Sequence, residues 1–164
     1  QRQMCIRDRY SIAMLEKNPH MRAVVFDSPF CCELLNSEIR SRGIKRLSAQ
    51  EGDFERGNIP SGHDAIMLTY VLHSIPPERC EALLRRVYER IPEGGVIIVN
   101  EFLLEDNGMS PAFSALMAFN IFMLSNGGSL YKRSEIETWL NDVGFKNVKV
   151  IKTSPVILSL TAEK

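Results

Sequence analysis

The sequence has no excess of either charge, because 20 Lys and Arg residues balance 20 Asp and Glu residues. A protein whose main partner is nucleic acid usually carries a basic excess, so this composition argues against nucleic acid as the main partner. The chain also lacks an apolar run of the ~20 residues that a membrane-spanning helix needs. Its longest apolar stretch, 111–124, is shorter and is interrupted by Ser114 and Asn120. We therefore expect no nucleic-acid partner and no membrane partner.

Metal and disulfide chemistry have little support in the sequence. The four cysteines are Cys5, Cys31, Cys32 and Cys80, and none forms a C-x-x-C pair. No His lies at a spacing typical of metal ligands. Adjacent cysteines such as Cys31 and Cys32 are poor disulfide partners. The pattern predicts no metal site and a reducing, cytoplasmic location.

The chain also lacks internal repeats, low-complexity tracts and linkers, and its 164 residues suit one domain or part of one. Residues 1–9 show no clear period and run directly into a segment that reads as the middle of a helix. We expect 1–9 to be a non-native tail derived from sequence assembly, with a natural polar tail as the alternative. The domain would then cover residues 10–164.

Strand-like and helix-like patterns alternate along the rest of the chain. Strands are predicted at 22–27, 46–51, 64–70, 96–100, 147–152 and 156–161, and helices at 11–18, 30–41, 77–91, 111–124 and 134–143. Repeated strand–helix alternation predicts an α/β fold with a doubly wound, mostly parallel sheet. The last two strands are joined by a short turn and should form an antiparallel pair at the sheet edge.

Three of these elements carry more specific expectations. The strand at 22–27 is a nearly continuous apolar run, which is typical of a strand covered on both faces. The helix at 111–124 is apolar almost all round, so it should be buried or covered by a partner. Ser134 and Glu137 have the spacing of a capping box at the start of the last helix.

Polar residues stand where successive strands end, and in open α/β sheets this edge binds ligands. Asp27 could accept hydrogen bonds from ribose hydroxyls, or it could cap the following turn. Asp53 and Phe54 could bind an exocyclic amine and stack on a base, or they could be a turn acid beside a core Phe. Each pair of alternatives stays open from these residues alone.

His73 follows an apolar strand and is the sharpest candidate for chemistry. An imidazole at this place could accept a proton near neutral pH, provided that a partner orients it. Glu101, which ends the next strand, could come within reach. The alternative is a His that only makes structural hydrogen bonds. His20 and His63 lie in predicted turns and receive no role.

Six segments, taken in order, resemble class I S-adenosylmethionine-dependent O-methyltransferases of the small-molecule type, the group of plant caffeate-like and bacterial polyketide enzymes. The segments are AVVFDSP (23–29), EGDFERGNIP (51–60), DAIMLTYVLHSIPPERC (64–80), IPEGGVIIVNEFLLED (91–106), NGG (126–128) and SEIETWLNDVGF (134–145). The resemblance extends from Ser11 to the C-terminus.

The resemblance implies a role for each matching residue. Asp27 would bind the cofactor's ribose, and Asp53 and Phe54 would flank its adenine. His73 would deprotonate a hydroxyl of a small aromatic or polyketide-like acceptor, and Glu101 would hold that imidazole. No metal is required.

The sequence departs from the family pattern at three positions. The usual acid after the His is Ser74, and Leu130 stands where many relatives place a second Glu. Four residues before the His, where relatives usually have a Lys, this chain has Thr69, which we expect to contact the cofactor. Base orientation would then rest on Glu101 alone. This leaves open a non-catalytic methyltransferase-like module for binding or dimerisation, and, with less support, a nicotinamide-dependent oxidoreductase.

The largest departure concerns the front of the domain. The family places a strand and a Gly-rich loop directly before the helix at Ser11, and these are absent from residues 1–164. The relatives also carry an upstream helical domain through which they form homodimers. We expect these 164 residues to lack the central strand of the sheet and to bind S-adenosylmethionine poorly.

Overall fold

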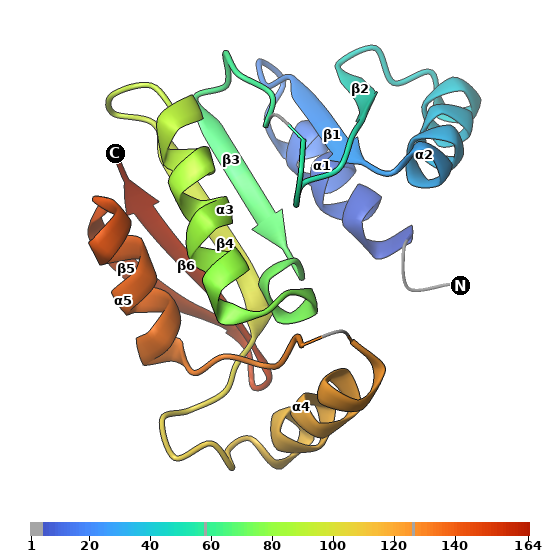
Figure 1. Ribbon diagram of the computed structural model, residues 1–164. Helices are drawn as coiled ribbons and strands as arrows, with labels where there is room; N and C mark the ends of the chain where they lie inside the picture. The colour runs from blue at the N-terminus through green and yellow to red at the C-terminus, as the bar shows by residue number, and fades with distance from the viewer. Residues whose placement is uncertain (1–4, 58, 126) are drawn as a thin grey trace. The chain divides into compact units, whose positions relative to one another are not determined.

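The computed structural model describes residues 5–57, 59–125 and 127–164. They form two compact units, Gln1–Asn58 and Ile59–Lys164. The first unit contains α1 (Cys5–Lys17), β1 (Ala23–Asp27), α2 (Pro29–Arg42) and β2 (Leu47–Glu51). The second contains β3 (Ala65–Thr69), the short 3₁₀ helix η1 (Leu72–Ser74), α3 (Pro77–Arg90), β4 (Val96–Phe102), α4 (Ala112–Leu124), α5 (Arg133–Val143), β5 (Lys146–Ser154) and β6 (Ile157–Glu163) (Figure 1).

The helix α1 begins at Cys5, six residues before the predicted start at Ser11. Part of the segment that was expected to be a tail therefore continues the helix. Residues 1–4 lie outside the described residues, and the origin of segment 1–9 stays a prediction.

In the first unit, β1 and β2 run parallel and end side by side at Asp27 and Glu51. Successive strand residues point to opposite faces, and Ala23 and Val25 pack with both helices into one small core. That core is formed by buried Ile12, Leu15, Leu35 and Leu47. Val24, on the opposite face, is 38% exposed. The prediction that this strand is covered on both faces is wrong for this unit, because both helices pack on the same side.

The helix α2 begins and ends within one residue of its predicted bounds, 30–41. The Ser28 side chain accepts a hydrogen bond from the Cys31 backbone N–H, and Pro29 occupies the first helical position, where its missing N–H costs nothing. Gly43 ends the helix with φ 65°, a left-handed conformation that glycine adopts without a Cβ clash.

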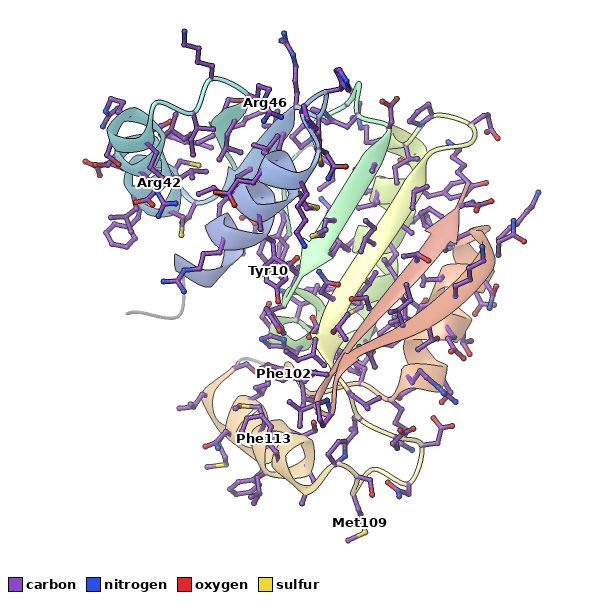
Figure 2. All side chains as sticks on the ribbon, turned by 180° about the vertical axis from the view of Figure 1, so that it is seen from behind. Tyr10, Arg42, Arg46, Phe102, Met109 and Phe113 are labelled. Carbon is purple, nitrogen blue, oxygen red and sulfur yellow. The ribbon has the colours of Figure 1, made fainter. Side chains whose placement is uncertain are left out.

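In the second unit the strand order is β3-β4-β6-β5. The pair β3–β4 is parallel, and β6 is antiparallel to both β4 and β5. Both figures show α3 and α5 on the same face of this sheet (Figures 1 and 2). The predicted α/β alternation is confirmed, as is the antiparallel C-terminal pair, with β5 at the edge.

Among the described strands, four have a neighbour on one side only: β1, β2, β3 and β5. Among the described residues, β1 is hydrogen-bonded only to β2, and β3 only to β4. Each of β1 and β3 therefore has one open edge, and the expectation that a single strand would pair with both stays a prediction.

The apolar helix α4 is largely exposed, which contradicts its predicted burial within the chain. Its exposed side chains include Leu116 at 70%, Phe119 and Phe122 at 65%, and Leu124 at 86%. The alternative, that a partner covers it, stays a prediction. No helix in the described ranges is long and apolar enough to cross a membrane.

The start of α5 differs from the predicted capping box. Lys132 precedes the helix, and its backbone N–H donates to the Glu135 carboxylate at 2.7 Å. Glu137 instead lies 3.6 Å from the Arg133 side chain, one turn away. The predicted pair of Ser134 and Glu137 is wrong because the helix begins at Arg133, so Ser134 already lies inside its first turn.

Candidate functional site

The ends of β1 and β2 surround a cavity of about 480 Å³ in the first unit. Its lining consists of Asp27, Ser28, Pro29, Glu51, Gly52, Asp53 and Phe54. The structure thus brings together the three residues that the sequence proposed for this end of the sheet, Asp27, Asp53 and Phe54. Sequence reasoning missed Glu51 as a separate candidate, although its parallel register with Asp27 places both carboxylates at one edge.

Gly52 is required by packing beside this cavity. A Cβ at Gly52 would overlap the ring of Phe26, and the Gly52 N–H donates to the Asp27 carbonyl oxygen at 2.9 Å. The glycine therefore allows the chain to turn close to β1. This reason was not visible in the sequence, because it depends on which side chain lies opposite.

Both carboxylates that were expected to bind a ligand also hold their own turns. One oxygen of Asp27 accepts the Ser28 N–H at 2.7 Å, and one oxygen of Asp53 accepts the Glu55 N–H at 2.8 Å. The local alternatives considered for these residues are thus correct in part. A carboxylate offers two oxygens and about four acceptor sites, so a local bond leaves capacity for a ligand.

In the second unit, His73 lies in η1, directly after β3, and Glu101 lies near the end of β4. His73 Nδ1 is 2.8 Å from Glu101 Oε2, and the two side chains are 19% and 4% exposed. Glu101 Oε1 accepts the backbone N–H of Leu72 at 2.9 Å and that of His73 at 3.4 Å. The expected proximity of Glu101 to the imidazole is therefore present.

This geometry selects one form of the imidazole. A deprotonated carboxylate only accepts hydrogen bonds, so the Nδ1 that faces Glu101 must carry the proton. The lone pair of a neutral His73 then lies on Nε2, the atom that faces away from Glu101. An imidazole held in this way can take a proton at Nε2 while its carboxylate partner stabilises the resulting charge.

A buried polar network fixes the strand ends beneath this pair. The amide oxygen of Asn100 accepts a hydrogen bond from the Ser159 hydroxyl at 2.5 Å. The amide nitrogen of Asn100 lies 3.4 Å from Thr69 Oγ1. Thr69 and Asn100 are only 9% and 5% exposed. Thr69, the predicted cofactor-side residue, is therefore bonded to the neighbouring strand at the end of β3.

Aromatic rings surround His73. Its ring centroid is 5.9 Å from that of Phe102 and 6.3 Å from that of Tyr70. The ring of Phe102 is in turn 6.2 Å from that of Phe113, the second residue of α4. Figure 2 labels Phe102 and Phe113. Tyr70 has φ 55°, which is uncommon for a non-glycine residue and is often found at functional sites. Sequence reasoning did not single out these aromatic residues.

The departures from the family pattern have local structural roles. The Ser74 hydroxyl donates to the Val71 carbonyl oxygen at 2.6 Å, within the turn that carries His73. Leu130 is 5% exposed and belongs to the apolar core. Neither supplies a second acid beside His73, so Glu101 alone provides the carboxylate that contacts His73 in the described structure.

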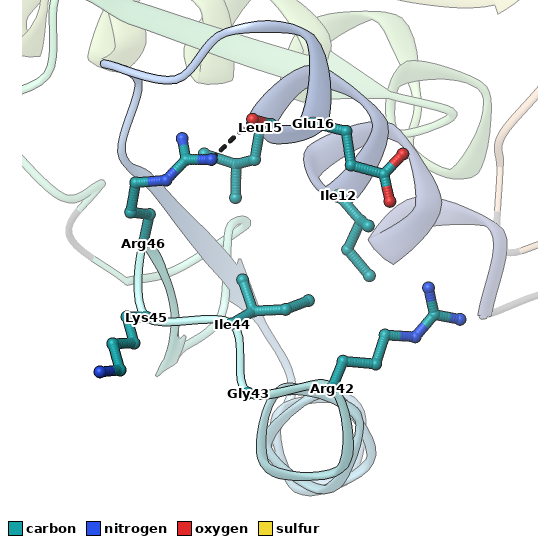
Figure 3. A pocket seen from close by; sticks show the side chains of 8 residues that line it. All are labelled: Ile12, Leu15, Glu16, Arg42, Gly43, Ile44, Lys45 and Arg46. Atoms are coloured by element: carbon teal, nitrogen blue, oxygen red, sulfur yellow. Dashed lines mark hydrogen bonds between the residues drawn. The ribbon is translucent and has the colours of Figure 1, made fainter.

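A second cavity, of about 420 Å³, lies in the first unit at the opposite ends of its strands (Figure 3). Its most buried cation, Arg46, donates to the backbone carbonyl oxygens of Leu15, Asn18 and Met21 at 2.8–2.9 Å. Arg46 therefore joins α1 and the start of β1 to the start of β2, which explains it as a structural residue. Within the described ranges, no group of three or more His, Cys, Asp or Glu residues could hold a metal ion.

The predicted site residues divide between the two units, with Asp27, Asp53 and Phe54 in the first and Thr69, His73 and Glu101 in the second.

The sequence matches the family model of the O-methyltransferase domain over residues 11–146. The chain belongs to this O-methyltransferase family. The resemblance predicted from its motifs is thereby confirmed.

Named relatives extend the match. The chain is 30% identical over 142 residues to a 3-hydroxy-5-methyl-1-naphthoate 3-O-methyltransferase of Streptomyces sahachiroi, covering 86% of this chain and 41% of the relative. It is 32% identical over 137 residues to an L-tyrosine C(3)-methyltransferase of Streptomyces lavendulae, covering 82% and 37%. The chain therefore spans less than half the length of these curated relatives.

Solved structures show the same fold. A family 2 O-methyltransferase from Planctomyces limnophilus in complex with apigenin superposes with a TM-score of 0.87 at 29% identity, over 94% of this chain and 47% of that one. The structure of PigF with SAH gives a TM-score of 0.86 at 27% identity, over 93% and 46%. These similarities confirm the Rossmann-like methyltransferase fold.

Proposed function

We propose that the protein to which this chain belongs transfers a methyl group from S-adenosylmethionine to a hydroxyl of a small aromatic or polyketide-like acceptor. The observation that carries this proposal is the contact between His73 Nδ1 and the buried carboxylate of Glu101. It leaves Nε2 as the proton acceptor, as a general base requires.

The residues at the ends of β1 and β2 fit the adenosine part of the cofactor. The cavity there combines the carboxylates of Asp27, Glu51 and Asp53 with the ring of Phe54. Short carboxylates at this position accept hydrogen bonds from ribose hydroxyls, and an aromatic ring can stack on a base. When bound, S-adenosylmethionine supplies an electrophilic methyl group on a sulfonium centre.

The chain's own residues prepare the acceptor oxygen. His73 Nε2 takes the proton of the acceptor hydroxyl, which makes that oxygen a better nucleophile. Glu101 keeps the ring in place and stabilises the positive charge that His73 gains. Because Glu101 is 4% exposed, water competes little for this interaction. Correct alignment of the acceptor contributes much of the rate in such a transfer.

The rings of Tyr70, Phe102 and Phe113 support an aromatic acceptor. They lie in a connected row beside His73, and Phe113 is 49% exposed, so it can contact a bound molecule. Flat rings pack favourably against aromatic side chains in offset or edge-on geometry. The naphthoate relative and the apigenin complex both involve aromatic compounds.

Replacement of His73 tests this proposal in a protein that carries the chain behind a strand and Gly-rich loop. We expect His73→Ala to reduce kcat about 10²- to 10⁴-fold, as for loss of a general base, while S-adenosylhomocysteine still binds. Methyl transfer to a hydroxynaphthoate is the assay, and His63→Ala is the matched control. Unchanged turnover in the His73 variant would remove this residue as the base.

A non-catalytic module is the alternative that Ser74 and Leu130 favour, because neither position supplies a further acid. It predicts that the unmodified longer protein binds S-adenosylhomocysteine but methylates none of a panel of phenols. We further propose a homodimer for the longer protein, since α4 exposes a large apolar surface.

A further inference from the structure

The turn that carries His73 is held at its backbone as well as at its ring. The carbonyl oxygen of Leu72 lies 3.4 Å from the thiol of Cys80, which lies in the first turn of α3. The N–H groups of Leu72 and His73 both donate to Glu101. The side of the turn formed by His73 to Ile75 contacts a different part of the chain, the segment between α4 and α5.

Gly128, in that segment, packs directly against the backbone of His73. A Cβ at Gly128 would overlap the His73 carbonyl oxygen and would lie 2.9 Å from the carbonyl carbon of Ser74. Both atoms belong to the backbone, so no side chain could rotate away to make room. Any larger residue would have to displace the turn that carries the imidazole.

Tyr131 holds the end of the same turn. Its hydroxyl donates to the Ile75 carbonyl oxygen at 2.5 Å, and its side chain is buried. Its ring packs edge-on against Trp139 of α5, with the ring centroids 4.8 Å apart. The core of the unit therefore fixes the position of the hydroxyl, and its hydrogen bond to Ile75 restrains the end of the turn.

We infer that Gly128 and Tyr131 are positioning residues for His73. Gly128 allows the backbone of the turn to lie against the segment between α4 and α5, and Tyr131 fixes the end of the turn at Ile75. The segment that contains Leu130 thus holds the backbone of the base rather than its ring. The catalytic meaning of this inference rests on the proposed function, but the positioning itself can be measured without turnover.

The test uses the 164-residue chain, labelled with ¹⁵N, and the variants Gly128→Ala and Tyr131→Phe. Long-range ¹H–¹⁵N spectra of the histidine rings show which nitrogen carries the proton, and His73→Gln assigns the signal. We expect unmodified His73 to show a single Nδ1–H form and both variants to lose it. The amides of Leu72 and His73 should exchange about five- to tenfold faster, as for the loss of one hydrogen bond.

Two controls separate positioning from general destabilisation. Gly95→Ala also introduces a Cβ against backbone, 2.9 Å from the Asp64 carbonyl oxygen, but at the start of β4. Tyr88→Phe removes a hydroxyl at the far end of α3. Both controls should leave the His73 ring signal unchanged.

If Gly128→Ala does not fold, Tyr131→Phe decides, because it keeps the ring that packs on Trp139. A folded Tyr131→Phe variant with the single Nδ1–H form and unchanged exchange would overturn the inference. Failure of the proposed function would appear separately, as unchanged turnover of His73→Ala in the longer protein.

Discussion

At the scale of the single residue, Glu101 is a buried carboxylate that accepts hydrogen bonds with both oxygens. Glu101→Gln would leave one oxygen acceptor and place a donor amide against an N–H group. We expect the free energy of unfolding to fall by about 1–3 kcal/mol, the usual range for a buried unsatisfied group. Urea unfolding of the 164-residue chain measures this. Glu93→Gln, at an exposed position, is the control, and an equal effect at both sites would contradict the argument.

Cys80 gives a prediction about pH. Burial raises the pKa of its thiol from 9.0 to about 12, and burial also raises the pKa of the Tyr131 hydroxyl. The folded chain therefore retains protons that the unfolded chain releases above pH 9. This contribution to stability is complete below pH 9 and is lost as the pH rises toward 12.

We expect urea midpoints to fall steadily between pH 9 and pH 11, and Cys80→Ala to reduce that fall. Cys31→Ala, at a partly exposed position, should leave the pH dependence unchanged. A midpoint that is independent of pH in the unmodified chain would count against this assignment.

The sequence predicted the acidic and imidazole side chains of the site because they follow apolar strands, a pattern that can be read locally. It could not predict the need for Gly52 or Gly128. That need comes from Phe26 in one case and from the His73 backbone in the other. The same limit applies to the aromatic row of Tyr70, Phe102 and Phe113, which joins three separate segments.

At the scale of the element, the start of α5 can be tested by comparing two acids. Glu135→Ala removes the carboxylate that accepts the Lys132 N–H, and should cost about 0.5–2 kcal/mol, as for other helix caps. Glu137→Ala removes a partly exposed contact to Arg133 and should cost less. Thermal unfolding of both variants is the measurement. A larger loss of stability for Glu137→Ala than for Glu135→Ala would instead support the capping box of Ser134 and Glu137 predicted from the sequence.

The helix α4 gives a second prediction at this scale. Phe119→Glu combined with Phe122→Glu should lower self-association in sedimentation velocity, because both side chains are 65% exposed. Asn120→Glu adds charge to the same helix without removing apolar surface and is the control. Equal self-association in all three proteins would show that this helix is not the contact.

Most element types were predicted correctly, since periodicity and the Pro and Gly signals are local properties. The exposure of Val24 was not, because it depends on what else covers the strand, and for α4 the sequence left burial and cover by a partner as alternatives.

At the scale of the whole molecule, the two units differ in the size of their cores. Among its described residues, the first has a core cluster of only four buried residues, whereas in the second β4 is paired on both sides and Ile97 and Val99 are fully buried. We expect backbone amides of β1 and β2 to exchange hydrogen faster than those of β4 and β6, because local opening is easier where fewer apolar contacts are lost. Exchange followed by mass spectrometry distinguishes them.

The open edges of β1 and β3 give a prediction about cofactor binding. Without a strand and glycine loop beside these edges, the 164-residue chain should bind S-adenosylhomocysteine weakly, because much of the cofactor's contact surface is lacking. Isothermal titration of this chain and of a longer protein that supplies the segment compares them. Micromolar binding by the 164 residues alone would refute the expectation.

Because Glu101 has two roles, the stability of the fold and the orientation of His73 depend on the same side chain. One side chain both closes the loop after β3 and orients the imidazole, so a lineage that no longer needed methylation would still be selected to keep this acid for folding. Retention of this acid alone is consequently a poor marker of an active enzyme among distant descendants, and the imidazole is the more informative position to inspect.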